Sequence, residues 1–260
     1  MNWMDDARRL WRLVARYVPE RPPRPPGAAG RPPISNEAVF MRIVLFLRAG
    51  CSWEVFDEIS RGCGVSGRTV RSRLAEWRAL GVFEQVCEEL RAQLEAPAVA
   101  HMDAMFVRAR YSGDQVGLTR HGKGSKLQAL VGDDSLPLAI QMESANPHEA
   151  TTAVALLELV DDLPPIVVAD RAYDSDKLRD EVQALDSKLL VPHKSNRKRP
   201  PRDQEHIGRH YKERWRVERL FAWLAAWRRL ATRWEANPLN YGTWINLAVS
   251  LVYVRGGLLP

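Results

Sequence analysis

The stretch that decides the fold reads PIVVADRAYDSDKL and spans residues 165–178. Four apolar residues, 166–169, run directly into Asp170, and the chain then turns. A short apolar run of this kind predicts a buried strand, and strand ends are where an α/β sheet presents side chains to a ligand. We therefore expect a site at Asp170. Asp174 and Asp176, in contrast, are explained by the next helix, as its cap or first-turn acids.

The segments around this stretch alternate between strand and helix patterns. Three strands are expected to form an antiparallel meander, over residues 98–110, 125–132 and 136–143. Helices and strands should then alternate, over residues 148–163, 165–170, 175–185, 188–193 and 206–231, before a last helix near residues 239–254. This element order predicts an α/β fold of the RNase H-like kind, in which helices flank a mixed sheet.

The composition is typical of a soluble protein that binds nucleic acid. The chain has 260 residues, a net charge of +6 and a pI of about 9.4, and its arginines are clustered. Clustered arginines favour phosphate ligands. The longest apolar stretch, 244–254, is too short to span a membrane, and the three cysteines lack the spacing of a zinc site. We expect a cytoplasmic protein with reduced thiols.

Four segments are expected along the chain. Residues 1–18 show the apolar spacing of a short helix, and residues 19–34 contain so many prolines that they should form an extended linker. Residues 35–96 have the pattern of an all-α domain. The strands and helices that follow place the RNase H-like domain over residues 97–260.

The all-α segment contains a helix, a glycine-rich turn and a second helix from Ser66 to Leu80, which predicts a helix-turn-helix. Arg68, Arg71 and Ser72 fall on the outer face of the second helix, where they could contact DNA in the major groove. The inner face carries Val70, Leu74 and Trp77. An ordinary helical hairpin with solvated arginines remains the alternative.

Three carboxylates stand out by their positions. Asp103 lies among apolar residues in the first strand, Asp170 ends the fourth, and Glu218 lies on the long helix. Buried carboxylates are usually paired or bound to metal, and two that face one another repel unless a cation lies between them. The set predicts a divalent metal site for phosphoryl transfer. Each residue also has an ordinary explanation when taken alone. Asp103 could be an exposed strand residue, Asp170 could cap a turn, and Glu218 could form an ion pair with Arg214.

Several segments together resemble the DDE transposases of bacterial insertion sequences, in the insertion-sequence-five group. GRPPISNEAVFMRIVLFLRAGCSWEVF (30–56) is similar to the N-terminal region of that group. HMDAMFVRA (101–109) resembles the strand with the first aspartate, and VVADRAYDSDKLR (167–179) resembles the second-aspartate motif. YKERWRVERLFAWLAAWRRLATRW (211–234) resembles the helix that carries the glutamate.

The signature of that helix in the family is Tyr-x2-Arg-x3-Glu-x6-Lys. Tyr211, Arg214 and Glu218 match it in type and spacing, whereas Ala225 stands where the family has lysine. Residues three and four apart share a helical face, so Arg228 or Arg229 is predicted to replace the missing lysine in a phosphate contact. Ion pairing or packing of these arginines along a tryptophan is the alternative.

The resemblance implies that Asp103, Asp170 and Glu218 bind Mg²⁺ or Mn²⁺, as two ions, in an RNase H-like catalytic domain. It also implies cut-and-paste movement of a DNA element: water attacks a phosphodiester at the end of the element, and the freed 3′-hydroxyl then attacks target DNA. The expected partners are the terminal inverted repeats and target DNA, bound by a homodimer or higher oligomer at the bacterial nucleoid. Tyr211 and Arg214 would contact DNA.

Two other interpretations of the whole chain stay open. One is a non-catalytic helix-turn-helix regulator derived from a transposase, and the other is a metal-dependent nuclease that cuts DNA without joining it. The basic segment RHGKGSK (120–126) is also ambiguous, because Lys123 and Lys126 could contact phosphates or merely flank a β-turn.

Overall fold

The computed structural model describes residues 2–21, 33–195, 198, 200–202 and 204–259, without the side chains of residues 204–206. Most of the expected linker therefore lies outside the described residues. The chain forms two compact units. The helical unit comprises Met1–Gln93, Ala226–Ala231 and Leu239–Pro260, and the sheet unit comprises Leu94–Ala225 and Thr232–Pro238. The sequence placed all of residues 97–260 in one domain, whereas the structure groups residues 226–231 and 239–260 with the N-terminal helices.

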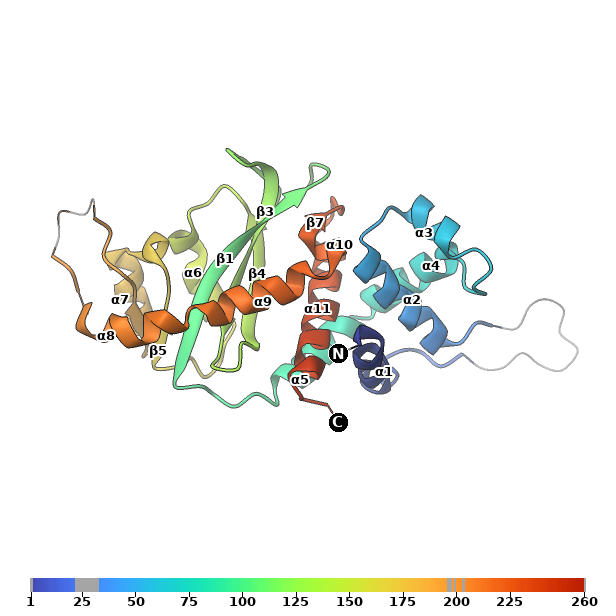
Figure 1. Ribbon diagram of the computed structural model, residues 1–260, viewed down its shortest axis with the longest axis horizontal. Coiled ribbons are helices and arrows are strands. Elements are labelled where there is room, and N and C mark those ends of the chain that lie inside the picture. Colours follow the sequence, from blue (N-terminus) through green and yellow to red (C-terminus); the bar gives the residue numbers. More distant parts are fainter. Residues whose placement is uncertain (1, 22–32, 196–197, 199, 203, 260) are drawn as a thin grey trace, which may run out of the picture. The chain divides into compact units, whose positions relative to one another are not determined.

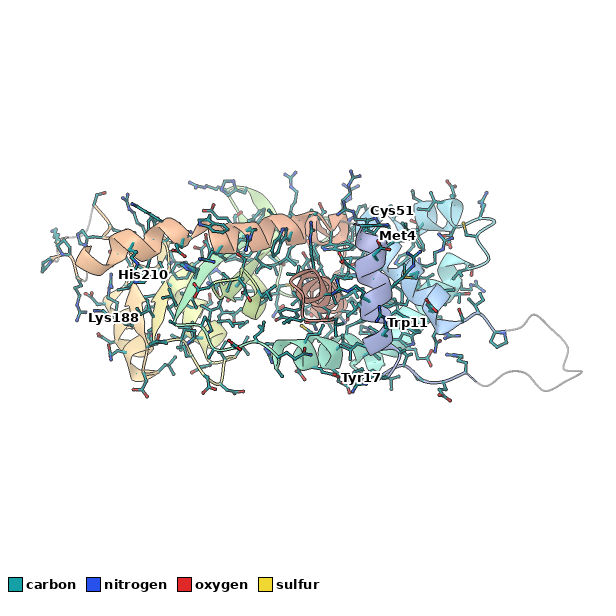
Figure 2. The ribbon with its side chains drawn as sticks, turned by 60° about the horizontal axis from the view of Figure 1, so that its bottom comes forward. Met4, Trp11, Tyr17, Cys51, Lys188 and His210 are labelled. Atoms are coloured by element: carbon teal, nitrogen blue, oxygen red, sulfur yellow. The ribbon has the colours of Figure 1, made fainter. Side chains whose placement is uncertain are left out.

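The helices of the helical unit are drawn in Figure 1, and several buried aromatic side chains form part of their core. They are α1 (Trp3–Val14), α2 (Asn36–Ala49), α3 (Trp53–Ile59), α4 (Gly67–Ala79), α5 (Val82–Arg91), α10 (Arg228–Ala231) and α11 (Pro238–Arg255). Trp11, labelled in Figure 2, lies with its ring centroid 5.4 Å from Phe40 and 6.4 Å from Trp77. Helix α11 is buried along most of its length, so it needs neighbours around it and joins this unit.

A mixed seven-stranded sheet forms the centre of the sheet unit. Its strands are β1 (Val99–Ala109), β2 (Gly117–Thr119), β3 (Gly122–Val131), β4 (Pro137–Ser144), β5 (Ile166–Val168), β6 (Lys188–Leu190) and β7 (Thr232–Arg233). Strand β3 pairs antiparallel with β1, β2 and β4, whereas β5 is parallel to β1 and β6. The predicted mixed α/β sheet flanked by helices is confirmed, and the hairpin strand β2 is an addition.

Helices cover both faces of the sheet. They are α6 (Glu149–Leu157), α7 (Asp176–Ala184), α8 (Gln204–His210) and α9 (Trp215–Ala225), with 3-10 turns η1 (Arg171–Tyr173) and η2 (Tyr211–Glu213). Ala100 and Met102 of β1 lie in the core that includes α6 and α7. Side chains alternate along a strand, so Asp103 belongs to the opposite face. Helix α9 packs against β1 and β3, and Figure 1 shows it crossing in front of β1.

The long helix expected over residues 206–231 is interrupted twice. A 3-10 turn, η2, separates α8 from α9, and α9 ends at Ala225 before α10 begins at Arg228. The second interruption carries Arg228 and Arg229 into the other unit. Tertiary contacts override helix propensity here, because the guanidinium of Arg229 donates a hydrogen bond of 2.7 Å to the carbonyl oxygen of Cys51 within the helical unit.

Candidate active site and nucleic-acid interface

The sheet brings Asp103, in the middle of β1, close to Asp170, which follows the end of the neighbouring parallel strand β5. His101 of β1 is in register with Val168 of β5. Asp103 lies two residues further along β1, and Asp170 lies two residues beyond Val168 in extended backbone, so both side chains belong to the same face. Strand β5 ends at Val168, and Asp170 turns the chain into η1 by accepting a hydrogen bond of 2.7 Å from the backbone N–H of Ala172. The carboxylate that follows the apolar run is therefore both a turn cap and a neighbour of Asp103.

The carboxyl group of Asp103 lies in an environment that disfavours its charge. Burial raises its pKa, the charge of Arg214 lowers it, and the charge of Asp170 raises it again. One oxygen accepts a hydrogen bond of 2.8 Å from the N–H of Ala104. Because two partly buried carboxylates repel, the position between them favours a cation.

Arg214 is the cation that meets Asp103 in this structure. Its Nη2 donates to Oδ2 of Asp103, and Nη1 donates to the hydroxyl of Tyr211 at 3.3 Å. The guanidinium also lies 5.3 Å from the centroid of the Tyr211 ring. Tyr211 and Arg214 thus meet, as their spacing predicts, although Tyr211 begins a 3-10 turn instead of an α-helical one. Their predicted DNA contacts stay predictions.

Glu218 lies on α9 and is exposed to solvent. It follows Arg214 by four residues, which places it on the same side of the helix. Among the described residues, no hydrogen bond or ion pair joins its carboxylate to Asp103, Asp170 or Arg214. The structure therefore brings two of the three predicted carboxylates together and leaves the third one helical turn away from the arginine that contacts Asp103.

Sequence reasoning missed a further carboxylate, Glu149. Burial raises its pKa, Lys126 lowers it, and the charges of Asp170 and Asp103 raise it further. Glu149 therefore belongs to the same electrostatic cluster as the two aspartates. Its position at the first residue of α6 offered no distinguishing signal, because acids are common in the first turn of any helix.

Lys126 lies in a strand, as expected, but its side chain is buried. It lies within strand β3, is 8% exposed, and donates from Nζ to the carbonyl oxygen of Pro147 at 2.6 Å. Its ammonium is also 3.8 Å from a carboxylate oxygen of Glu149. In this structure the charge of Lys126 therefore faces a carboxylate inside the unit, and its phosphate contact stays a prediction. The hairpin turn between β2 and β3 matches the alternative interpretation, and Lys123 stays a predicted contact.

The second helix of the expected helix-turn-helix is α4. Ser66 caps it by accepting a hydrogen bond of 3.2 Å from Thr69 N–H, as predicted. The three predicted outer residues, Arg68, Arg71 and Ser72, are all exposed. Arg71 also lies 4.7 Å from the centroid of the Trp53 ring on α3. This contact orients one arginine while its neighbours stay in solvent.

Two other arginines are buried. Arg73 of α4 is buried and donates to the side chain of Asn36. Arg229 is 4% exposed and lies 4.6 Å from the ring centroid of Phe46 and 6.0 Å from that of Trp244. The packing of Arg229 against aromatic rings matches the alternative interpretation, and the contact of Arg228 or Arg229 with phosphate stays a prediction. Arg228 is exposed, but it does not continue the helix of Glu218.

Asp174 has a structural role instead of the expected capping role. Ser175 caps α7, accepting from Leu178 N–H at 3.4 Å. The fully buried carboxylate of Asp174 accepts from Arg179 at 3.2 Å and from Lys194 N–H at 3.0 Å. These bonds tie the turn after β5 to α7 and to the chain after β6, and so they support the position of Asp170.

Known families and proteins resemble the chain over most of its length. Residues 96–253 match the family described as "Transposase DDE domain", and residues 7–87 match that described as "Putative transposase of IS4/5 family". The chain is 33% identical over 199 residues to "Putative transposase for insertion sequence element IS402" of Burkholderia cepacia, covering 70% of this chain and 89% of the relative. It is 35% identical over 115 residues to an uncharacterized 16.2 kDa protein of the same element, covering 42% and 77%.

The fold resembles that of a solved transposase structure. The cryo-EM structure of the piggyBac transposase synaptic complex with hairpin DNA matches with a TM-score of 0.56 and 11% identity, covering 98% of this chain and 72% of that chain. At this identity the likeness concerns the fold alone. In the described part of the chain, no helix is long and apolar enough to cross a membrane.

Proposed function

The chain belongs to the DDE transposases of insertion sequences, and we propose that it cuts and rejoins DNA at the ends of its own element with Asp103, Asp170 and Glu218 as metal ligands. The observation that carries this proposal is the register of β1 and β5, which brings Asp103 and Asp170 to one face of the sheet. The family is one of enzymes that act on DNA, and it implies use of a divalent metal.

The residues present fit a divalent cation. Both aspartates offer hard oxygen donors, and each is oriented by a backbone N–H, from Ala104 and Ala172. Burial and the charge of Asp170 both disfavour the ionised form of the Asp103 carboxyl group, and the guanidinium of Arg214 already lies against it. These features favour positive charge between the carboxylates. We propose Mg²⁺, as two ions, because all the donors are carboxylate oxygens.

Two residues compete for the place of third ligand. Glu218 is exposed and has no described partner that would hold it away from a metal. Glu149 interacts electrostatically with both aspartates, whose charges raise its pKa. The ammonium of Lys126, however, lies 3.8 Å from its carboxylate and balances its charge. We propose Glu218 because a ligand must approach as a free carboxylate, and the side chain of a residue one turn past Arg214 can reach toward the same edge.

The chemistry proposed is an in-line displacement at phosphorus. When bound, the cations would lower the pKa of an attacking water or 3′-hydroxyl and stabilise charge on the phosphate oxygens. Asp103 and Asp170 hold fixed donor oxygens, and Arg214 must leave Asp103 before that oxygen can bind a cation. Once released, the guanidinium is available to a phosphate oxygen, which it can bind with two N–H groups.

The finer biological proposals follow from this chemistry. Helix α4 would bind the terminal inverted repeats through Arg68, Arg71 and Ser72, and two or more copies would bring both ends together. Cutting at the ends followed by joining to target DNA gives cut-and-paste movement within the cytoplasm.

The experiment that tests the proposal uses the full chain, Mg²⁺ and DNA carrying the ends of the element. Asp103→Asn, Asp170→Asn and Glu218→Gln should each lower end cleavage by at least about a hundredfold and leave end binding within about twofold. Glu158→Gln, on an exposed carboxylate of the same unit, is the matched control. Near-normal cleavage by Glu218→Gln together with loss in Glu149→Gln would transfer the third position to Glu149.

Two products separate the proposal from its alternatives. Strand-transfer products joined to target DNA identify a transposase, whereas cleaved ends without joined products identify a nuclease. Binding without either product identifies a regulator.

A further inference from the structure

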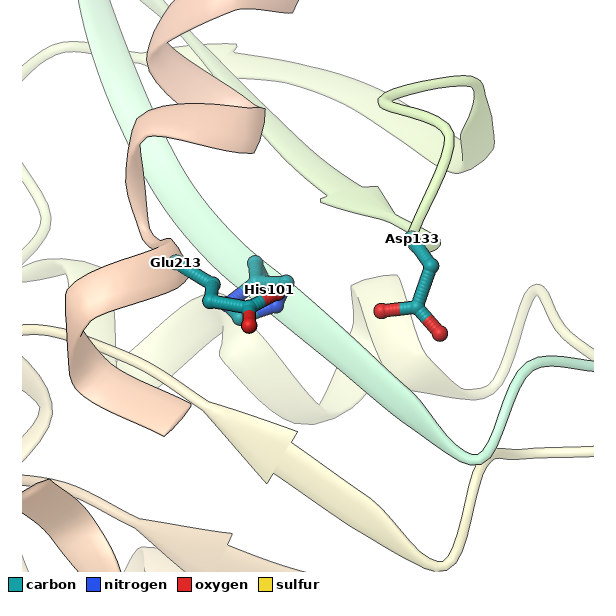
Figure 3. A group of neighbouring side chains, drawn as sticks. All are labelled: His101, Asp133 and Glu213. Carbon is teal, nitrogen blue, oxygen red and sulfur yellow. The ribbon is translucent and has the colours of Figure 1, made fainter. Parts of the chain in front are cut away.

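A second cluster of ligand-type side chains lies next to the proposed catalytic carboxylates. His101 of β1, Asp133 of the turn after β3 and Glu213 of η2 converge (Figure 3), and one ligand atom from each lies within 4.8 Å of the others. All three belong to the sheet unit. None of them takes part in the proposed phosphoryl transfer.

The imidazole of His101 is the part of this cluster that ordinary packing does not explain. His101 is 1% exposed, and within the described residues neither ring nitrogen has a hydrogen-bond partner. A buried polar group without a partner costs about 1–3 kcal/mol. A neutral imidazole carries a lone pair on one ring nitrogen, and that nitrogen can bind a metal ion.

The two carboxylates form the outer part of the cluster. The side chains of Asp133 and Glu213 are 57% and 43% exposed, so a dissolved ion can reach them and they can change rotamer. Ligand atoms around a tetrahedral Zn²⁺ lie about 3.4 Å apart when the bonds are about 2.0–2.1 Å long. The present separations of up to 4.8 Å therefore require these mobile side chains to close by about 1.4 Å.

Arg216 lies beside both carboxylates of the cluster in this structure. Its Nε donates to Glu213 at 2.8 Å and lies 4.0 Å from Asp133, and its guanidinium lies 5.2 Å from the ring centroid of Trp215. Two carboxylates and one guanidinium leave a net negative charge. When a metal displaces the guanidinium from the carboxylates, it can keep its cation–π contact with the indole of Trp215. A single side chain thus supplies the positive charge that a metal would supply.

We propose that His101, Asp133 and Glu213 form a binding site for a transition-metal dication such as Zn²⁺, with Arg216 as the competing internal cation. An imidazole with two carboxylates suits Zn²⁺ better than Mg²⁺, which prefers oxygen ligands alone. The ion would join β1, the turn after β3 and η2, and so would fix the start of α9 on the sheet. This inference is independent of the proposed function.

The site can be tested by calorimetric titration of the full chain with Zn²⁺ at pH 7.5. The chain carrying Asp103→Asn and Asp170→Asn removes the proposed catalytic ligands and should still bind one Zn²⁺ per chain. Adding Glu213→Gln or His101→Gln should abolish this binding, whereas Glu158→Gln should not change it. If the chain with both aspartates replaced does not fold, Glu213→Gln is introduced as the single substitution. It should then lower the number of bound Zn²⁺ by one relative to the parent chain.

Arg216→Met distinguishes a metal site from an ion-pair network. If Arg216 competes with the metal, its removal should tighten Zn²⁺ binding tenfold or more, since a unit positive charge about 4 Å away repels a dication even through water. Lys212→Met, which removes an exposed cation beside Glu213, should have a much smaller effect. An absence of Zn²⁺ binding, or binding that Glu213→Gln leaves unchanged or that Arg216→Met weakens, would overturn the proposal.

Discussion

Removing Arg214 tests how strongly the site demands a positive charge. The ion pair between Arg214 and Asp103 is largely buried, with side-chain exposures of 14% and 17%. Arg214→Met keeps the length of the side chain and removes its charge, which leaves Asp103 with no cationic partner beside Asp170. Breaking a buried pair by removing one partner costs about 3–5 kcal/mol. Because both side chains are partly exposed to solvent, we expect a loss of unfolding free energy at the lower end, about 3 kcal/mol.

The sign of the pH dependence follows from the pKa of Asp103. Burial already raises this pKa above its ordinary value in the folded protein, and loss of Arg214 removes the main opposing effect. A raised carboxyl pKa means that the folded state binds more protons, so stability falls as pH rises from the unfolded pKa to the folded one. The variant should therefore match the parent at low pH, where Asp103 is protonated, and should lose stability progressively up to its own higher folded pKa.

The assay is urea unfolding of the parent and the variant across this pH range, without and with Mg²⁺. Mg²⁺ should recover part of the stability of Arg214→Met, because the cation replaces the lost charge between the carboxylates. In the Asp103→Asn background, Arg214→Met should cost less than about 1 kcal/mol, since the charge that needs a partner is gone. A loss that is independent of pH and equally large in the Asp103→Asn background would refute this reasoning and assign Arg214 to packing.

Two further predictions concern the helical unit. Arg68→Ala and Arg71→Ala should each cost about 1–3 kcal/mol of end binding if they read base edges, with relaxed preference at one base pair; a uniform loss over all sequences in a binding-site selection would make them phosphate contacts. Arg229→Met should lower the free energy of unfolding by about 2–4 kcal/mol, because it removes a buried charge that is hydrogen-bonded to Cys51 and enclosed by aromatic rings, yet it should leave the salt dependence of DNA binding unchanged. Arg228→Ala is the matched exposed control, and a flatter salt slope for Arg229→Met than for Arg228→Ala would contradict the structural role.

Local sequence patterns were sufficient to predict most of the strands and helices, and to single out Asp103 and Asp170 as candidate site residues. The apolar run before Asp170 predicts a strand that ends on that residue, and the polar cap at Ser66 predicts the start of α4; both features depend on neighbours within a few residues. Asp103 and Asp170 could be singled out in advance from their positions in two expected strands, and the parallel pairing of β1 with β5 makes those strands neighbours. Periodicity failed in the long helix, where Ala226 and Trp227 fit a helical pattern but α9 ends.

The remaining features depend on residues far apart in the sequence, and only the tertiary structure decided them. Glu149 joins the aspartates, Lys126 turns inward to meet Glu149, and Arg229 is buried against Phe46 in the other unit. A charged residue looks the same in a sequence whether it is solvated or paired, because its burial is set by the partners that folding brings to it. The sequence by itself determined which groups could carry charge and where strands would end, and the packing of the sheet and its helices decided which of those charges face one another.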